Sequence, residues 1–189
     1  MGFADLERHQ VRDKDFRVVV VPHPTSRVAI IAPHGGRIER RTSEIAAAIA
    51  GDSFNLYIFE GIRKSDNYTA LHLTSHLFDE PECIELIGRC LHVVAIHGCE
   101  GNDPRILLGG LDQSLKTQLA KAFGSANLTT EVDGHNFPAT EPNNICNRGL
   151  RRQGVQIELS AALRGSGQEK LVVRSEEHTS ELQSLTNLV

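Results

Sequence analysis

The stretch VAIIAPHGGRIERRTSEIAAAIAG, residues 28–51, decides how this chain is expected to fold. It begins with the apolar run 28–32, which is typical of a buried strand, and it breaks at a His-Gly-Gly before an alanine-rich helix pattern follows. Thr42 or Ser43 is a candidate N-cap, and Gly51 stands where such a helix would end. A strand that leads through a short loop into a helix is the repeating unit of α/β proteins. The histidine at the break needs a separate explanation.

The same alternation of apolar runs and helical patterns continues along the chain. Further strands are expected at RVVVV (17–21), NLYIFEG (55–61), LHLTS (71–75), HVVAIHG (92–98), ILLGG (106–110) and GVQIELS (154–160), with helices in FDEPECIELIGRC (78–90) and LDQSLKTQLAKAFG (111–124). Turn signals at 22–24 favour a hairpin between the first two strands, and 106–110 is expected beside 92–98. We therefore predict a single α/β domain with a mixed, mainly parallel central sheet and flanking helices.

Composition excludes several classes of protein. The chain has 189 residues, 40% of them hydrophobic and 23% charged, which suits one soluble domain. The net charge of −4 argues against a nucleic-acid partner, and no apolar run approaches the roughly 20 residues of a membrane span. The charged N-terminus lacks the apolar core of a signal peptide, so we expect a cytoplasmic protein, with release on cell lysis as the alternative. The cysteines form no CxxC pair, and most are expected to be reduced and buried: Cys83, Cys90, Cys99 and Cys146.

The C-terminal stretch RSEEHTSELQS, residues 174–184, has no apolar periodicity that would join it to a core. Written back into codons, it resembles a common sequencing-library adapter. We therefore assign 1–173 to a C-terminally truncated domain and expect 174–189 to be a non-native tail. The alternative is a natural polar helix or tail. Loss of a final helix would leave an apolar face of the sheet uncovered, at a cost in stability and solubility.

Two histidines stand where strands are expected to end. His34 follows VAIIAP and His97 follows HVVAI, and each is followed by glycine. Ligands of open α/β sheets bind at the carboxyl ends of the strands, and Glu39 is reachable from the same loop as His34. Two imidazoles and one carboxylate suit a catalytic zinc with one open position. Glu158, a carboxylate among apolar neighbours, is a candidate for proton transfer. The alternative is that the histidines are ordinary core residues.

Several motifs together resemble the phage and bacterial poly-gamma-glutamate hydrolase family: APHGGRIE, TSEIAAAIAG, FEG, LHLTSHLFDEP, HGC, GGLD, NNICNRG and GVQIELSAALR. The resemblance runs from about residue 15 to 164. It implies a zinc-carboxypeptidase-like fold and cleavage of the gamma-glutamyl amide bonds of a capsule polymer. It also implies Zn²⁺ held by His34, Glu39 and His97, with Glu158 as the general acid/base that acts on a metal-activated water.

An anionic gamma-glutamyl polymer requires cations at its binding site. Arg148 in NICNRG is the first candidate, assisted by Asn147, and Arg37 in the ligand loop is the second. The alternative for Arg148 is an arginine that braces a loop.

Other polar residues receive supporting roles. His72 and His76 are interpreted as structural or as partners of the ligands, with His76 nearer the cleft, and Asp79 is a candidate to orient a ligand imidazole. Cys99 lacks an identifiable base and is a poor candidate nucleophile.

Two other functions remain open at this point. One is a related zinc amidase or carboxypeptidase that acts on peptidoglycan stem peptides, and the other is an inactive module that binds an anionic polymer. We expect a monomer with no nucleic-acid or membrane partner.

Overall fold

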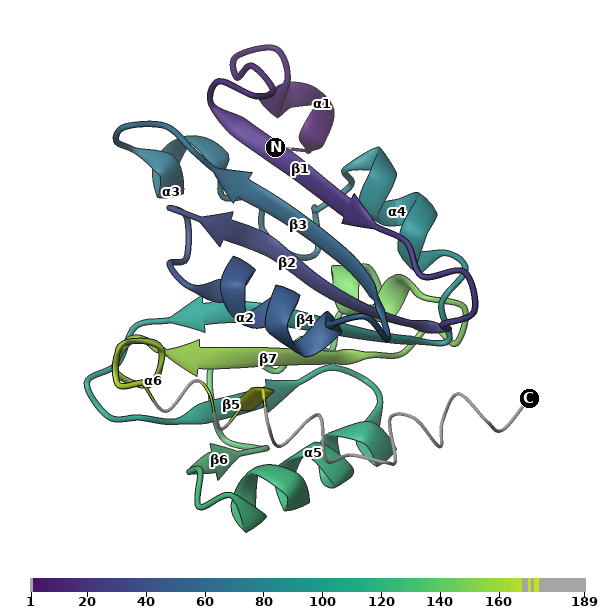
Figure 1. The fold of residues 1–189 in the computed structure, drawn as a ribbon, viewed down its shortest axis with the longest axis vertical. Coiled ribbons are helices and arrows are strands. Elements are labelled where there is room, and N and C mark those ends of the chain that lie inside the picture. Colours follow the sequence, from purple (N-terminus) through teal and green to yellow (C-terminus); the bar gives the residue numbers. More distant parts are fainter. Residues whose placement is uncertain (1, 168–169, 171, 174–189) are drawn as a thin grey trace.

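A seven-stranded sheet runs through the computed structural model, which describes residues 2–167, 170 and 172–173 (Figure 1). The spatial order is β1-β3-β2-β4-β7-β5-β6. The strands are β1 Phe16–Val21, β2 Val28–Gly36, β3 Asn55–Gly61, β4 His92–Cys99, β5 Ile106–Gly109, β6 Thr130–Glu131 and β7 Val155–Ser160. The strands β3, β2, β4 and β7 are mutually parallel, whereas β1 and β5 pair antiparallel with their neighbours β3 and β7. The predicted mixed, mainly parallel sheet is confirmed.

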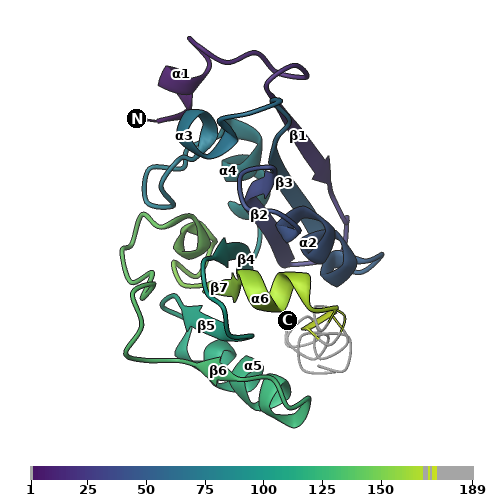
Figure 2. The ribbon, with the colours of Figure 1, turned by 90° about the vertical axis from the view of Figure 1, so that its left-hand side faces the viewer.

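Helices cover both faces of this sheet (Figure 2). They are α1 Phe3–Leu6, α2 Thr42–Ala50, α3 Asn67–Leu71, α4 Pro81–Ile87, α5 Gln113–Ser125, the short 3₁₀ helix η1 Ile145–Arg148 and α6 Ala161–Gly165. Side chains from α2, α5 and α6 pack in one apolar cluster with Ile30, and side chains from α1, α3, α4 and η1 pack in the other with Ile31. Because successive strand residues point to opposite faces and both faces are covered, the part of β2 before His34 is apolar. No helix among the described residues is long and apolar enough to cross a membrane.

Two strand neighbours differ from the sequence-based expectation. β1 pairs antiparallel with β3, so the predicted hairpin with β2 is wrong. The crossover β2–α2–β3 places β3 beside β2, and Asn55 at the start of β3 bonds the connecting segment through His23 N and the carbonyl of Ser26. β5 likewise pairs antiparallel with β7 and not with β4, because β7 occupies the place beside β4.

Two local predictions were also wrong. The segment 71–75 is not a strand, because α3 ends at Leu71 and the chain continues as a loop. The alternation of apolar and polar residues arises because Leu71 and Leu73 are both buried in one apolar cluster. Helix α2 has Arg41, at φ 76°, as its N-cap, without a side-chain cap. The hydroxyl of Thr42 instead bonds the Glu39 carbonyl. The predicted end of α2 at Gly51 is confirmed.

The four cysteines are free and buried, as expected. The predicted tail, 174–189, lies outside the described residues. The boundary at 173 therefore stays a prediction.

Candidate metal centre and its pocket

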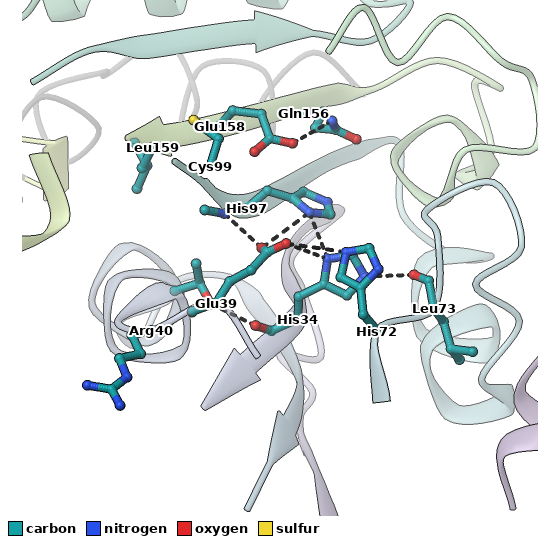
Figure 3. Close-up of polar contacts among 12 residues, drawn as sticks. His34, Glu39, Arg40, His72, Leu73, His97, Cys99, Gln156, Glu158 and Leu159 are labelled. Carbon is teal, nitrogen blue, oxygen red and sulfur yellow. Dashed lines mark hydrogen bonds and ion pairs between the residues drawn. The ribbon is translucent and has the colours of Figure 1, made fainter. Parts of the chain in front are cut away.

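The candidate site forms where β2 and β4 stop pairing. Their register ends at Ile31↔Ala95, and the pairing of β2 with β3 shifts between Ala32 and Gly35. A register shift bends a strand and re-aims its side chains. His34 and His97 lie beyond the last residues that pair β2 with β4, so their rings can meet at the carboxyl end of the sheet (Figure 3).

Three buried side chains converge at this point. His34 Nδ1 lies 3.0 Å from Glu39 Oε1 and 3.1 Å from His97 Nδ1, and His97 Nδ1 lies 3.6 Å from Glu39 Oε2. A tetrahedral zinc with ligand bonds of about 2.0–2.1 Å holds its ligand atoms about 3.3 Å apart. The donor types and their spacing therefore fit a zinc ion. The sequence pattern grouped these three residues, and the structure brings them together.

Hydrogen bonds hold two of the three side chains, those of His34 and Glu39, in position. His34 Nε2 lies 2.7 Å from the carbonyl of Leu73; donating its proton there leaves the Nδ1 lone pair directed at the cluster. The Gly98 N–H donates to Glu39 Oε2 at 2.7 Å. The Thr42 hydroxyl donates to the carbonyl of Glu39 at 2.8 Å and fixes the loop that carries it. The His34 imidazole and the Glu39 carboxylate thus both have backbone partners of the kind that orient metal ligands.

The two glycines after His34 are required by packing. A Cβ at Gly35 would lie 2.2 Å from the Ser43 hydroxyl oxygen. Gly36 has φ +64°, and a Cβ there would lie 2.6 Å from the carbonyl oxygen of Gly61. The His-Gly-Gly break therefore lets the end of β2 lie directly against α2 and β3 while the histidine points into the site.

The charges of the cluster favour a cation. Burial by itself would raise the pKa of Glu39, but His34, His72 and His97 outweigh that effect and hold the pKa well below its usual range. Burial lowers the pKa of His34, despite the opposing charge of Glu39. Burial acts in the same direction on His97, but Glu39 and Glu158 raise its pKa overall. The cluster thus contains an ionised Glu39 carboxylate with imidazole nitrogens on either side, a set of groups that attracts a positive charge.

Glu158 lies opposite His97 in the β4–β7 register (Figure 3). Its Oε1 accepts from Gln156 Nε2 at 2.9 Å, and Gln156 in turn accepts from Asn144 Nδ2 at 3.0 Å. Burial raises the pKa of Glu158 to about 7. A carboxyl with this pKa can take up and release a proton near neutral pH.

His72 contacts the cluster more closely than was predicted. Its Nε2 lies 3.5 Å from Glu39 Oε1, and its ring centroid lies 3.9 Å from that of His34. The prediction that His76 approaches more closely was wrong: His76 lines the pocket, but His72 is the one that contacts the cluster. Asp79 accepts from Phe3 N at 2.5 Å and orients no ligand imidazole. The loop at 72–75 explains both errors, because a strand would have placed these side chains differently.

Arg164 is a residue of the site that sequence reasoning missed. Its guanidinium donates to the carbonyls of Leu159 at 2.9 Å, Cys99 at 3.0 Å and Arg40 at 2.5 Å. These bonds join the ends of β7 and β4 to the loop that carries Glu39. A Cβ at Gly98 would lie 2.6 Å from the guanidinium carbon, so this glycine makes room for Arg164.

A pocket of about 580 Å³ opens over the cluster. Its walls include the cluster, Glu158 and side chains from 72–76 and 136–141. Cys99 also lines it, but burial raises the pKa of that thiol to about 11, which disfavours the thiolate that a nucleophile needs.

The structure places the three predicted substrate-binding residues outside the lining of this pocket. Asn147 is fully buried, and its amide bonds the backbone on either side, for example the carbonyl of Ala139 at 2.8 Å. Arg148 donates to the carbonyl of Phe78 at 3.0 Å. Arg37 is exposed and donates to the carbonyl of Arg63 at 2.7 Å. Asn147 is therefore a brace of the pocket wall.

Known proteins are similar to this chain in sequence and in fold. The sequence model of the family described as poly-gamma-glutamate hydrolase matches residues 1–188. The UPF0714 protein YndL of Bacillus subtilis strain 168 is 33% identical over 167 residues, which cover 87% of this chain and 65% of YndL. A solved bacteriophage poly-gamma-glutamate hydrolase superposes with a TM-score of 0.91 at 27% identity over 97% of both chains. A zinc-free structure of YndL gives a TM-score of 0.84 at 27% identity over 95% of this chain and 97% of the other. This chain belongs to the poly-gamma-glutamate hydrolase family.

Proposed function

We propose that this protein is a zinc-dependent hydrolase of the gamma-glutamyl amide bonds of poly-gamma-glutamate. The observation that carries the proposal is the convergence of His34, Glu39 and His97 in one pocket, with Glu158 beside them in strand register. The name of the bacteriophage relative supports the substrate, and the zinc-free description of the YndL structure supports the metal. The chain spans 65% of the length of YndL, so the activity of the whole relative is carried over here only as part of this proposal.

His34, Glu39 and His97 would hold the metal. When bound, zinc supplies a positive charge that activates a water molecule and polarises the scissile carbonyl. Glu158 accepts a proton from the attacking water through a carboxylate oxygen. The water oxygen bonds to the carbonyl carbon, the carbon–nitrogen bond breaks, and Glu158 returns the proton to the leaving amine nitrogen. Gln156 holds the Glu158 carboxyl by the bond at 2.9 Å, the Leu73 carbonyl holds His34, and the Gly98 N–H holds Glu39.

The direct test is incubation of the zinc-loaded protein with poly-gamma-glutamate, with and without a chelator, followed by sizing of the products. We expect shorter polymer only without the chelator. Glu158→Gln should retain zinc and lose turnover, whereas His34→Ala should lose both. Glu85→Gln, at an exposed position of α4, is the matched control and should behave as wild type. Intact polymer after incubation with zinc-loaded wild type would refute the proposal.

Two parallel measurements address the other functions. Gamma-linked stem peptides of peptidoglycan are offered in place of the polymer, and faster cleavage of these peptides would identify a related amidase. Polymer binding without cleavage would identify a binding module. The size distribution of the products also separates endo from exo cleavage, since random internal cuts shorten the polymer early in the reaction.

A further inference from the structure

The active-site pocket lacks the cations that an anionic polymer needs. Among the described residues, no lysine or arginine lines this pocket. Four carboxylates line it: Glu39, Glu100, Glu141 and Glu158. Each gamma-linked glutamate in a polymer keeps a free α-carboxylate, because the amide bond uses the side-chain carboxyl. A divalent metal would offset only part of the negative charge of the lining. Residues of the polymer that flank the scissile bond therefore require a cationic surface next to the pocket.

A second cavity of about 480 Å³ adjoins the active-site pocket. His76 lines both cavities. The segment 141–144 also separates them, because Glu141 and Asn144 line the active-site pocket while Pro142 and Asn143 line the second cavity. A polymer that extends past the scissile bond in this direction would pass from one cavity into the other.

Two arginines give the second cavity its positive charge. Arg148 is half-buried, and its bond to the carbonyl of Phe78 fixes the guanidinium while other N–H groups remain to be used. Arg152 is exposed, and within the described part of the chain its side chain has no hydrogen bond or ion pair. Its backbone N–H donates to the carbonyl of Gly149 at 3.0 Å, which anchors the turn that presents it. Guanidinium groups bind carboxylates through two parallel hydrogen bonds.

The second cavity also contains one carboxylate, Asp79. This carboxylate accepts the Phe3 N–H at 2.5 Å and lies against Gly2. The lining of the cavity thus has two guanidinium groups and one carboxylate, which already has a backbone partner. Arg148, Arg152 and Asp79 together sum to one positive charge, opposite in sign to the carboxylates that line the active-site pocket.

We propose that this second cavity is a subsite for the α-carboxylate of a gamma-glutamyl residue that flanks the scissile bond, with Arg152 and Arg148 as its cations. The proposal rests on the proposed function. Arg148, the first cation predicted from the sequence, then binds the polymer in this second cavity and not in the pocket over the metal ligands. Arg152 is an additional cation that no sequence motif indicated. The proposal also accounts for an acidic catalytic pocket in a protein whose substrate is an anion.

The experiment compares wild type with Arg152→Gln and Arg152→Glu, using Lys121→Gln, an exposed cation of α5, as the control. Steady-state cleavage of poly-gamma-glutamate by the zinc-loaded protein gives KM and kcat. Arg152→Gln should raise KM about three- to fivefold, and Arg152→Glu about tenfold or more, since partly exposed ion pairs are of modest strength. The kcat should not change. The difference from wild type should shrink as salt is added, whereas Lys121→Gln should match wild type throughout.

Polymer binding is measured in parallel by titration calorimetry in a Glu158→Gln background, with and without Arg152→Glu. Weaker binding with Arg152→Glu supports the subsite even if wild type does not cleave the polymer, in which case only the proposed function fails. Cleavage by wild type with an unchanged KM in both Arg152 variants overturns the subsite and leaves the proposed function standing. If wild type neither binds nor cleaves the polymer, both proposals are wrong.

Discussion

Replacing Glu39 by glutamine tests whether this carboxylate is a metal ligand or only a hydrogen-bond acceptor. The substitution keeps the shape of the side chain and removes its charge. In the structure the Gly98 N–H points at one carboxylate oxygen at 2.7 Å, and the other oxygen lies 3.0 Å from His34 Nδ1. A glutamine has one oxygen, which the Gly98 N–H should take. Its NH₂ group would then donate to His34 Nδ1 and occupy the lone pair that a metal needs.

The two roles predict effects of different size. In the metal-free protein, Glu39→Gln replaces charge-assisted hydrogen bonds by weaker neutral ones. This should lower the free energy of unfolding by about 1 kcal/mol and lower Tm by about 2–4 °C in a domain of this size. For the metal, loss of a partner that only orients a ligand typically costs about 10- to 100-fold in affinity. Loss of Glu39 removes the one anionic ligand of the candidate set. We therefore expect zinc to bind at least about 1000-fold more weakly, or about 4 kcal/mol.

Zinc affinity is measured by competition with a chromophoric chelator, and thermal unfolding is followed with and without zinc. Wild type should gain about 4 kcal/mol of stability at a free zinc concentration of about 1000 times its Kd, and Glu39→Gln should gain almost none at the same concentration. Glu85→Gln serves again as the charge-matched control. If Glu39→Gln holds one zinc per chain within about tenfold of wild-type affinity, Glu39 is not a ligand and the reasoning fails.

Two further predictions concern the residues around the candidate ligands. Burial raises the pKa of Glu158 from 4.5 to about 7, so ionisation of this carboxyl destabilises the folded state as pH rises through that window. The free energy of unfolding of the metal-free protein is measured with urea at about pH 4 and pH 8. Between these two pH values, Glu158→Gln should become more stable relative to wild type by about 3 kcal/mol. An equal difference at both pH values would contradict this. Arg164→Gln leaves carbonyls at the ends of β4 and β7 without their charged donor, so Tm should fall by an amount equivalent to about 2–4 kcal/mol and zinc should bind more weakly. An unchanged zinc affinity would show that Arg164 acts on the fold alone.

The sequence groups the three candidate ligands because their positions follow from local pattern. Apolar runs mark buried strands, and histidines directly after them must lie at the edge where parallel strands end. His34, Glu39 and His97 can therefore be assigned to one cluster from the order of residues along the chain. The end of α2 at Gly51 is equally local, since a glycine after an alanine-rich helix pattern indicates a stop.

The parts that sequence reasoning missed depend on contacts between distant segments. Whether β1 pairs with β2 or β3 is decided by the crossover through α2, not by the turn residues at 22–24. Burial of Leu71 and Leu73 in one cluster produces the same alternation as a strand. Arg164 binds backbone carbonyls, which every residue has, so no pattern of side chains could reveal its partners.

The two buried carboxylates of the site show how one fold separates two chemical roles. Burial would raise the pKa of Glu39, but the imidazoles of His34, His72 and His97 hold it well below the usual range, and the carboxylate also accepts the Gly98 N–H. Glu158 is similarly buried but receives one amide hydrogen bond, so desolvation prevails and its pKa rises to about 7. A permanently ionised carboxylate suits a metal ligand, and one that titrates near neutrality suits a proton carrier. Both carboxylates lie beside His97. Moving the imidazoles away from Glu39 would therefore reduce this difference in pKa, and with it the distinction between ligand and base on which the proposed reaction depends.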